Sequence, residues 1–216
     1  MMAGMSEQAI QRAIEAYRTR DISICDLVVR SEMAINRLER SIDQMAIDIL
    51  AMEQPTAIDL RFILAVIKIN ADLERVGDAA VTITERVRDL QVFQSVELPV
   101  DIQRMASLAA GMIRKSLQAF IEFDAELAQT VLTMDDSVDR LNENAFFALS
   151  NVMKQKPELT PQALNALMIS RSLERVADHA TNIAEDVIFW VRGADVRHYL
   201  STNEAVRDRP GESDLH

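Results

Sequence analysis

The feature that most constrains this chain is a segment that occurs twice. Residues 73–87 read LERVGDAAVTITERV and residues 173–187 read LERVADHATNIAEDV, so nine of 15 positions are identical at an offset of 100. Repetition over such a span predicts two copies of one structural unit. A repeat that served only a hydrophobic core would need only its apolar residues to recur. Acids recur here as well, which indicates a duplicated site. These acids are Glu74, Asp78 and Glu85 in the first copy and Glu174, Asp178 and Glu185 in the second.

The composition predicts an all-α protein with few turns. Only five Gly and five Pro occur, and residues that favour helices are abundant. Breakers and apolar spacing predict six helices. Their approximate ranges are 2–18, 21–52, 57–91, 99–123, 124–154 and 161–192.

The repeat extends beyond the shared acids, because residues 21–42 align with residues 124–145 at an offset of 103. Each half therefore contains three predicted helices. We expect two tandem three-helix bundles, over residues 1–95 and 96–200, because long helices with short links form antiparallel bundles. The polar segment 201–216 is predicted to be a disordered tail.

Charge and apolar patterning exclude several classes of protein. The net charge of −11 argues against a nucleic-acid surface and favours a cationic partner, either a metal or a basic protein surface. The single cysteine, Cys25, fits a reducing compartment. The sequence has no apolar run of about 18–20 residues, and its start, MMAGMSEQAIQ, lacks the features of a signal peptide. These observations predict a cytoplasmic protein.

The repeated acids form pairs that can bind a cation. Glu74 and Asp78 are four residues apart and share a helix face, as are Glu174 and Asp178. The preceding helices supply partner positions, which are Asp135 with Asp139 in the second half and Glu32 with Asn36 in the first. Two facing helices of this kind can surround a hard or borderline cation with oxygen ligands. Uncompensated like charges at this spacing cost a few tenths of a kcal/mol per pair, and a cation reverses that sign.

A plainer interpretation is that such pairs are solvated surface charge, with Arg75 and Arg175 neutralising them locally. Recurrence in register, together with the additional pair in the fifth helix, favours metal binding. Asn182, Glu85 and Glu185 are further candidate ligands. His179 lies beside Asp178 but matches Ala79 in the first copy, and we interpret it as a surface histidine.

Four segments carry a resemblance to a known family. They are EQPTAIDLR (53–61), LERVGDAA (73–80), LERVADHATNIAE (173–185) and FWVRGADVRH (189–198). With the duplicated three-helix layout, they make the chain resemble the PhoU family up to about residue 200. PhoU proteins are cytoplasmic regulators associated with bacterial phosphate uptake.

The resemblance implies metal sites on acid-x-x-x-Asp motifs. These motifs fall on Glu74 with Asp78, on Glu174 with Asp178 and on Asp135 with Asp139. They fall imperfectly on Glu32 with Asn36. Iron, manganese, magnesium and zinc stay open as the metal. Asn36 and Ala79 depart from the pattern, so we expect the first site to bind more weakly.

The resemblance also implies a function without catalysis. It implies a negative regulator of the phosphate-starvation response that links the ATPase of the phosphate ABC transporter to a membrane sensor histidine kinase. Such a protein lies at the membrane only through its partners, and we include a homodimer among the expectations.

The main alternative is a carboxylate-bridged metal enzyme or metal-storage bundle. The di-iron enzymes of this type use Glu-x-x-His pairs on facing helices, and this sequence contains none. A helical chaperone or a purely structural bundle is a third alternative, but it would not need acids repeated in register. The sequence also shows no Gly-rich phosphate loop, Ser–His–Asp set or Cys–His zinc spacing.

Overall fold

The computed structural model describes residues 1–193, and this part of the chain is all-α, as predicted. It contains six α-helices and two short 3-10 helices. They are α1 (Met2–Thr19), α2 (Ile22–Met52), α3 (Ala57–Asp89), η1 (Leu90–Val92), α4 (Ile102–Glu122), α5 (Ala125–Gln155), η2 (Pro157–Leu159) and α6 (Thr160–Arg192).

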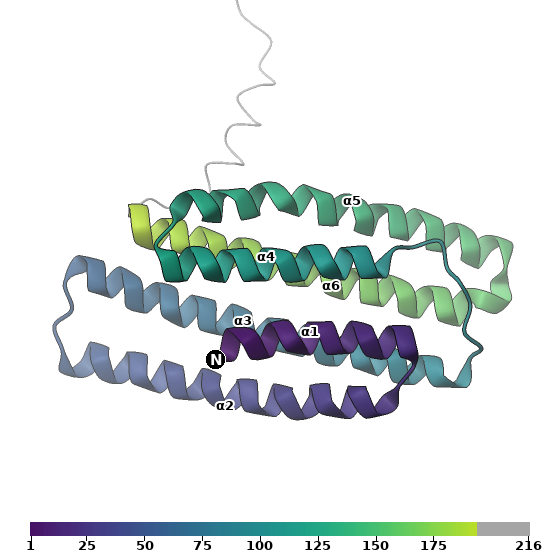
Figure 1. Cartoon of the computed structure of the whole chain (residues 1–216), viewed down its shortest axis with the longest axis horizontal. Helices are drawn as coiled ribbons and strands as arrows, with labels where there is room; N and C mark the ends of the chain where they lie inside the picture. Colours follow the sequence, from purple (N-terminus) through teal and green to yellow (C-terminus); the bar gives the residue numbers. More distant parts are fainter. Residues whose placement is uncertain (194–216) are drawn as a thin grey trace, which may run out of the picture.

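The helices form two three-helix bundles that lie side by side with their long axes roughly aligned (Figure 1). Helices α3 and α6 lie at the centre and make the most extensive contact between the halves. They are antiparallel, because Lys68 contacts Asp186 at one end while Arg86 contacts Met168 at the other. Helices α1 and α4 also touch each other, whereas α2 and α5 form the outer edges. The predicted pair of bundles is confirmed.

The duplication is visible in the turns between the first two helices of each half. Arg20 ends α1 with φ 58°, and Phe123, 103 residues later, ends α4 with φ 60°. A left-handed residue at this point closes a helix and turns the chain. The next residue begins the following helix as its cap, because Asp21 accepts from the Ser23 N–H at 2.8 Å and Asp124 from the Glu126 N–H at 2.9 Å.

One helix begins later than predicted. The expected start of α4 was near Pro99, but the helix starts at Ile102, because the Asp101 side chain accepts from the Arg104 N–H at 2.9 Å and caps it there. Helix α3 gives way to η1 at Leu90, close to its expected end. None of the helices in residues 1–193 is long and apolar enough to cross a membrane.

The largest core cluster draws on both halves and includes Ile10, Val76, Met112 and Val176. The predicted boundary at residues 95 and 96 falls in the link between η1 and α4. The division into two domains stays a prediction. The predicted tail at 201–216 and the end of the second bundle at 194–200 lie outside the described residues.

Candidate metal centres

The second half brings two acid pairs together between α5 and α6. Asp135 and Asp139 come from α5, and Glu174 and Asp178 come from α6. Burial is the largest cause that raises the pKa of Asp135 to about 6, and the charges of Asp139, Asp178, Asp136 and Glu174 contribute the rest of that rise. The pKa values of Glu174 and Asp178 are also raised, first by desolvation and then by neighbouring carboxylates that include Asp139. These acids therefore act on one another as one cluster, which we call the α5–α6 acid cluster.

The packing of the rest of α6 determines the direction in which the Glu174 and Asp178 side chains point. Leu173, Val176, Ala177 and Ala180 are fully buried in the core. Because residues four apart share a helix face, Glu174 and Asp178 point away from the core and toward α5. Burial of the apolar residues that recur in the repeat therefore fixes the helix face on which the recurring acids lie.

An orphaned oxygen marks the α5–α6 acid cluster. The Oδ1 atom of Asp135 is buried and has no hydrogen-bond partner. An unsatisfied buried acceptor costs about 1–3 kcal/mol, and a cation among these acids would satisfy it. A shallow pocket of about 400 Å³ adjoins the cluster and is lined in part by Asp139, Glu143 and Glu174. The donor set, all carboxylate oxygen, suits a hard cation.

The first half contains a related set between α2 and α3, which we call the α2–α3 acid cluster. Desolvation raises the pKa of Glu74, and the charges of Asp78, Glu39 and Glu32 raise it further, while Arg75 opposes them. The Asn36 amide donates to Glu32, whereas Asn36 Oδ1 is buried without a partner. This cluster contains an amide where the α5–α6 acid cluster has Asp139.

Sequence reasoning missed Glu39 as a member of the α2–α3 acid cluster. It lies seven residues after Glu32, on the same helix face. Comparison of the two halves overlooked it, because its counterpart at the offset of 103 is Asn142, which is not an acid. The helical spacing from Glu32 was the signal that could have found it.

Within residues 1–193, no three His, Cys, Asp or Glu side chains already stand in positions that would hold one metal ion. The acids of each cluster are close enough to shift one another's pKa, but their side chains would have to rotate to share a cation. The assignment of these acids as metal ligands therefore stays a prediction.

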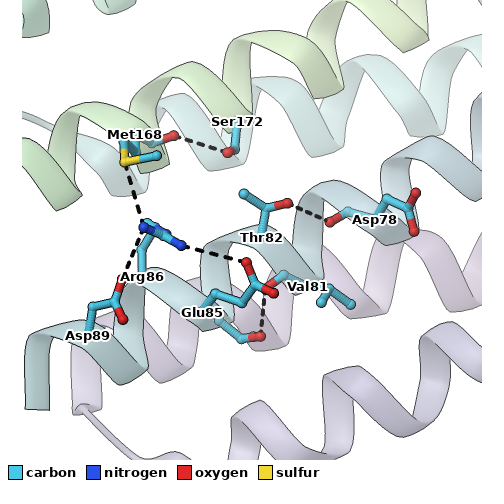
Figure 2. A network of polar contacts seen from close by, with 9 residues as sticks. Asp78, Val81, Thr82, Glu85, Arg86, Asp89, Met168 and Ser172 are labelled. Atoms are coloured by element: carbon cyan, nitrogen blue, oxygen red, sulfur yellow. Dashed lines mark hydrogen bonds and ion pairs between the residues drawn. The ribbon is translucent and has the colours of Figure 1, made fainter.

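The three additional candidate ligands occupy different surroundings. The Glu85 carboxylate is exposed and lies 3.6 Å from Arg86 (Figure 2). The Asn182 amide donates to Asp72 of α3 at 3.3 Å. Glu185 lines a pocket of about 340 Å³ that Lys68 and Asp186 also line.

The interpretation of His179 as a surface histidine is wrong. Its side chain is 17% exposed, and its Nδ1 lies 2.9 Å from Asp72 Oδ1 on α3. Asp72 is buried, and its Oδ1 also lies 3.9 Å from Arg75 Nη1. The His179 partner is 107 residues away in the sequence, so no pattern within one helix could reveal it.

The seam between α3 and α6 is asymmetric even though the helices are related by the repeat. At one end, Lys68 Nζ and Asp186 Oδ1 form an ion pair at 2.8 Å. The matching pair at the other end is Met168 with Arg86, and there the guanidinium contacts the Met168 sulfur at 3.8 Å and Asp89 at 3.0 Å (Figure 2).

Beside the seam lies a cleft of about 790 Å³, which we call the seam cleft. The two helices contribute matching residues to it. Its lining consists of Arg75, Asp78, Ala79 and Thr82 from α3 and Ser172, Arg175, Asp178, His179, Thr181 and Asn182 from α6.

The fold and the acids define a duplicated helical bundle whose halves present related carboxylate clusters. The chain belongs to the PhoU domain family, whose domain matches residues 1–87 and 102–187.

Relatives and solved structures agree with this assignment. The chain is 38% identical to a phosphate-specific transport system accessory protein PhoU homolog of Pseudomonas aeruginosa, over 98% of this chain and 88% of the relative. It is 32% identical to the Escherichia coli phosphate-specific transport system accessory protein PhoU, over 91% and 82%.

Among solved structures, the fold is similar to a crystal structure of PhoU from Pseudomonas aeruginosa, with a TM-score of 0.86 and 38% identity over 89% of this chain and 93% of that one. It is also similar to the phosphate transport system regulatory protein PhoU from Streptococcus pneumoniae, with a TM-score of 0.80 and 25% identity over 90% and 92%.

Proposed function

We propose that this protein is a cytoplasmic accessory protein of a phosphate transport system that represses the phosphate-starvation response when phosphate is plentiful. The observation that carries the proposal is similarity, over 91–98% of this chain, to proteins named as phosphate-specific transport system accessory proteins. In this role the protein links the ATPase of the phosphate ABC transporter to a membrane sensor histidine kinase. It lies at the membrane only through those partners, and it acts as a homodimer.

We infer that the protein acts by binding rather than by catalysis. Helices α2, α3, α5 and α6 each contain 31 or 33 residues and offer long rigid faces. Two acid clusters flank the central helix pair, on the α2 and α5 sides. A partner protein that binds to these helix faces would contact a fixed pattern of charge.

In this proposal, metal ions complete those faces. Asp135, Asp139, Glu174 and Asp178 would hold one cation, and Glu32, Glu74 and Asp78 would hold another. The buried oxygen of Asp135 that lacks a donor supports the fit. A bound cation would turn mutually repelling carboxylates into a fixed local charge.

The proposal is tested in a strain that lacks the gene, with a phosphate-starvation reporter measured in abundant phosphate. We expect high reporter activity in the deletion strain and repression after the wild-type gene is restored. A pull-down from phosphate-replete cells should recover the transporter ATPase and the sensor kinase. Normal repression in the deletion strain, with no related copy in the genome, would overturn the proposal.

The contribution of the metal centres is tested with a fourfold variant, D135N/D139N/E174Q/D178N, which should restore repression only in part. The matched control removes four acids that are exposed outside both clusters, as D48N/E97Q/E122Q/E158Q. This control should repress like the wild type. Equal repression by both variants would show that the acid cluster is not needed.

A further inference from the structure

The seam cleft has a chemistry that the acid clusters do not explain. Two arginines at matching positions of the repeat, Arg75 of α3 and Arg175 of α6, line the same space. Both side chains are exposed and reach into solvent. Within residues 1–193, Arg175 makes no ion pair, and the ion pair of Arg75 is a long contact at 3.9 Å to Asp72. Because Asp72 also binds His179 and Asn182, it does little to satisfy the Arg75 guanidinium.

The rest of the lining is almost entirely polar. Hydroxyl groups come from Thr82, Ser172 and Thr181, and an amide comes from Asn182. Ala79 is the apolar member, and no Phe, Tyr or Trp side chain lines the cleft. Guanidinium groups that line one polar cleft are suited to bind oxyanions, because their N–H forks match phosphate geometry.

The charges of the lining make anion binding depend on the metal centres. Arg75 and Arg175 are opposed by Asp78 and Asp178, which belong to the two acid clusters. Without cations the two signs cancel, and the remaining acids of the clusters repel an anion. With cations on Asp78 and Asp178, the positive charge of the arginines is no longer offset.

We propose that the seam cleft binds inorganic phosphate or pyrophosphate between Arg75 and Arg175 when cations occupy the flanking acid clusters. This inference rests on the metal centres of the proposed function. The volume of about 790 Å³ lies within the range of small-ligand sites and leaves room for the longer anion. Binding is coupled by thermodynamic linkage, so phosphate tightens cation binding by the same factor by which the cation tightens phosphate binding.

The test has two arms on the full-length protein. The first arm titrates Mn²⁺ and follows the free ion by electron paramagnetic resonance. The second arm titrates phosphate, pyrophosphate and, for comparison, adenosine monophosphate by calorimetry, once with Mn²⁺ and once with a chelator. We expect phosphate or pyrophosphate to bind at least tenfold more tightly with Mn²⁺. Adenosine monophosphate should gain little over phosphate, because no Phe, Tyr or Trp side chain lines the cleft to hold the base.

The deciding variant is R75Q/R175Q. It should bind Mn²⁺ at least as tightly as the wild type, because two positive charges near the acids are removed, and it should lose at least tenfold in anion affinity, while circular dichroism shows an unchanged fold. R75K/R175K keeps the charge without the fork and should recover part of the affinity. The matched control, R104Q/K115Q, removes two exposed positive charges from α4, and it should bind the anion like the wild type.

The outcomes separate the two proposals. Wild-type protein that binds Mn²⁺ but no phosphate or pyrophosphate would overturn the cleft while leaving the metal centres in place. Unchanged anion affinity in R75Q/R175Q would do the same. Absence of Mn²⁺ binding in the first arm would overturn both the metal centres and the coupled anion site.

Discussion

At the scale of single residues, Asp135 is the most informative side chain. Its pKa of about 6 lies above the ordinary value of 3.8 because of burial and neighbouring carboxylates. A raised pKa means that the folded protein binds this proton more tightly than the unfolded chain does. The associated stability is therefore fully present below about pH 4 and is lost as pH rises through about 6. A cation among these acids would remove the penalty at neutral pH.

The first prediction follows from this sign. In chelator, D135N should stabilise the protein at pH 8 by about 1–2 kcal/mol, a value discounted for partial exposure to solvent. Near pH 4 the gain should be close to zero. Urea unfolding at both pH values measures it, with D48N, an exposed acid of α2 outside both clusters, as the control. If D135N were destabilising at pH 8 in chelator, the carboxylate would not be strained as we describe.

Particular residues show which parts of the candidate site could be predicted from the sequence and which could not. The pairs at 74 and 78, 135 and 139, and 174 and 178 could be found because helical spacing puts each pair on one face. The partner of His179 could not be found, because Asp72 belongs to the other half of the chain. Asn36 was recognised as a departure, but its buried unpaired oxygen depends on how α2 packs against α3.

At the scale of helix pairs, the two halves solve one packing problem in different ways. A Cβ atom added at Gly77 of α3 would lie 3.1 Å from Ile35 Cδ1 of α2. The matching residues in the second half are Ala177 and Val138. The first half thus pairs a large residue with glycine, and the second pairs a smaller residue with alanine. The second half therefore has one carbon atom fewer on the outer helix and one more on the central helix than the first half has.

The second prediction uses this exchange. G77A alone should be destabilising by up to about 2 kcal/mol, because overpacking costs about 1–3 kcal/mol while helix propensity returns about 1 kcal/mol. I35V alone should cost about 0.5–1.5 kcal/mol. The double variant recreates the arrangement of the second half and should be more stable than either single variant, by urea unfolding. A G77A protein as stable as the double variant would show that Ile35 yields freely.

The third prediction concerns the seam between α3 and α6. H179A leaves the buried Asp72 without one of its partners and should cost about 1–3 kcal/mol of unfolding free energy. A double-mutant cycle with D72A should give a coupling energy of about 1–2 kcal/mol. The control is T82A at the position that matches Asn182, because the Thr82 hydroxyl donates only to Asp78 O of its own helix. That variant should change stability by less than about 0.5 kcal/mol, and a coupling energy near zero would mean that the contact does not fasten the seam.

At the scale of the whole molecule, the sequence was sufficient to predict two three-helix bundles. Helix positions follow from local signals, such as Asp21 and Asp124 at the starts of α2 and α5, and the repeat supplied the grouping. The way the halves pack was not predictable, because it depends on contacts such as Lys68 with Asp186, 118 residues apart. The seam cleft exists only after that packing.

The fourth prediction ranks the two metal centres. The α5–α6 acid cluster has four predicted carboxylate ligands, whereas the α2–α3 acid cluster contains Asn36 where the other has Asp139. D178A should therefore remove more of the Mn²⁺ affinity measured by calorimetric titration than D78A does. Equal losses, or a greater loss in D78A, would contradict the ranking.

The most direct test of the central claim, that the repeat encodes two cation sites, is anomalous diffraction from crystals of the full-length protein grown with Mn²⁺. We expect an anomalous peak among Asp135, Asp139, Glu174 and Asp178, with their carboxylates turned toward it. A weaker peak is expected beside Glu32, Glu74 and Asp78. An absence of anomalous density at both clusters in millimolar Mn²⁺, with the acids facing solvent, would contradict the claim.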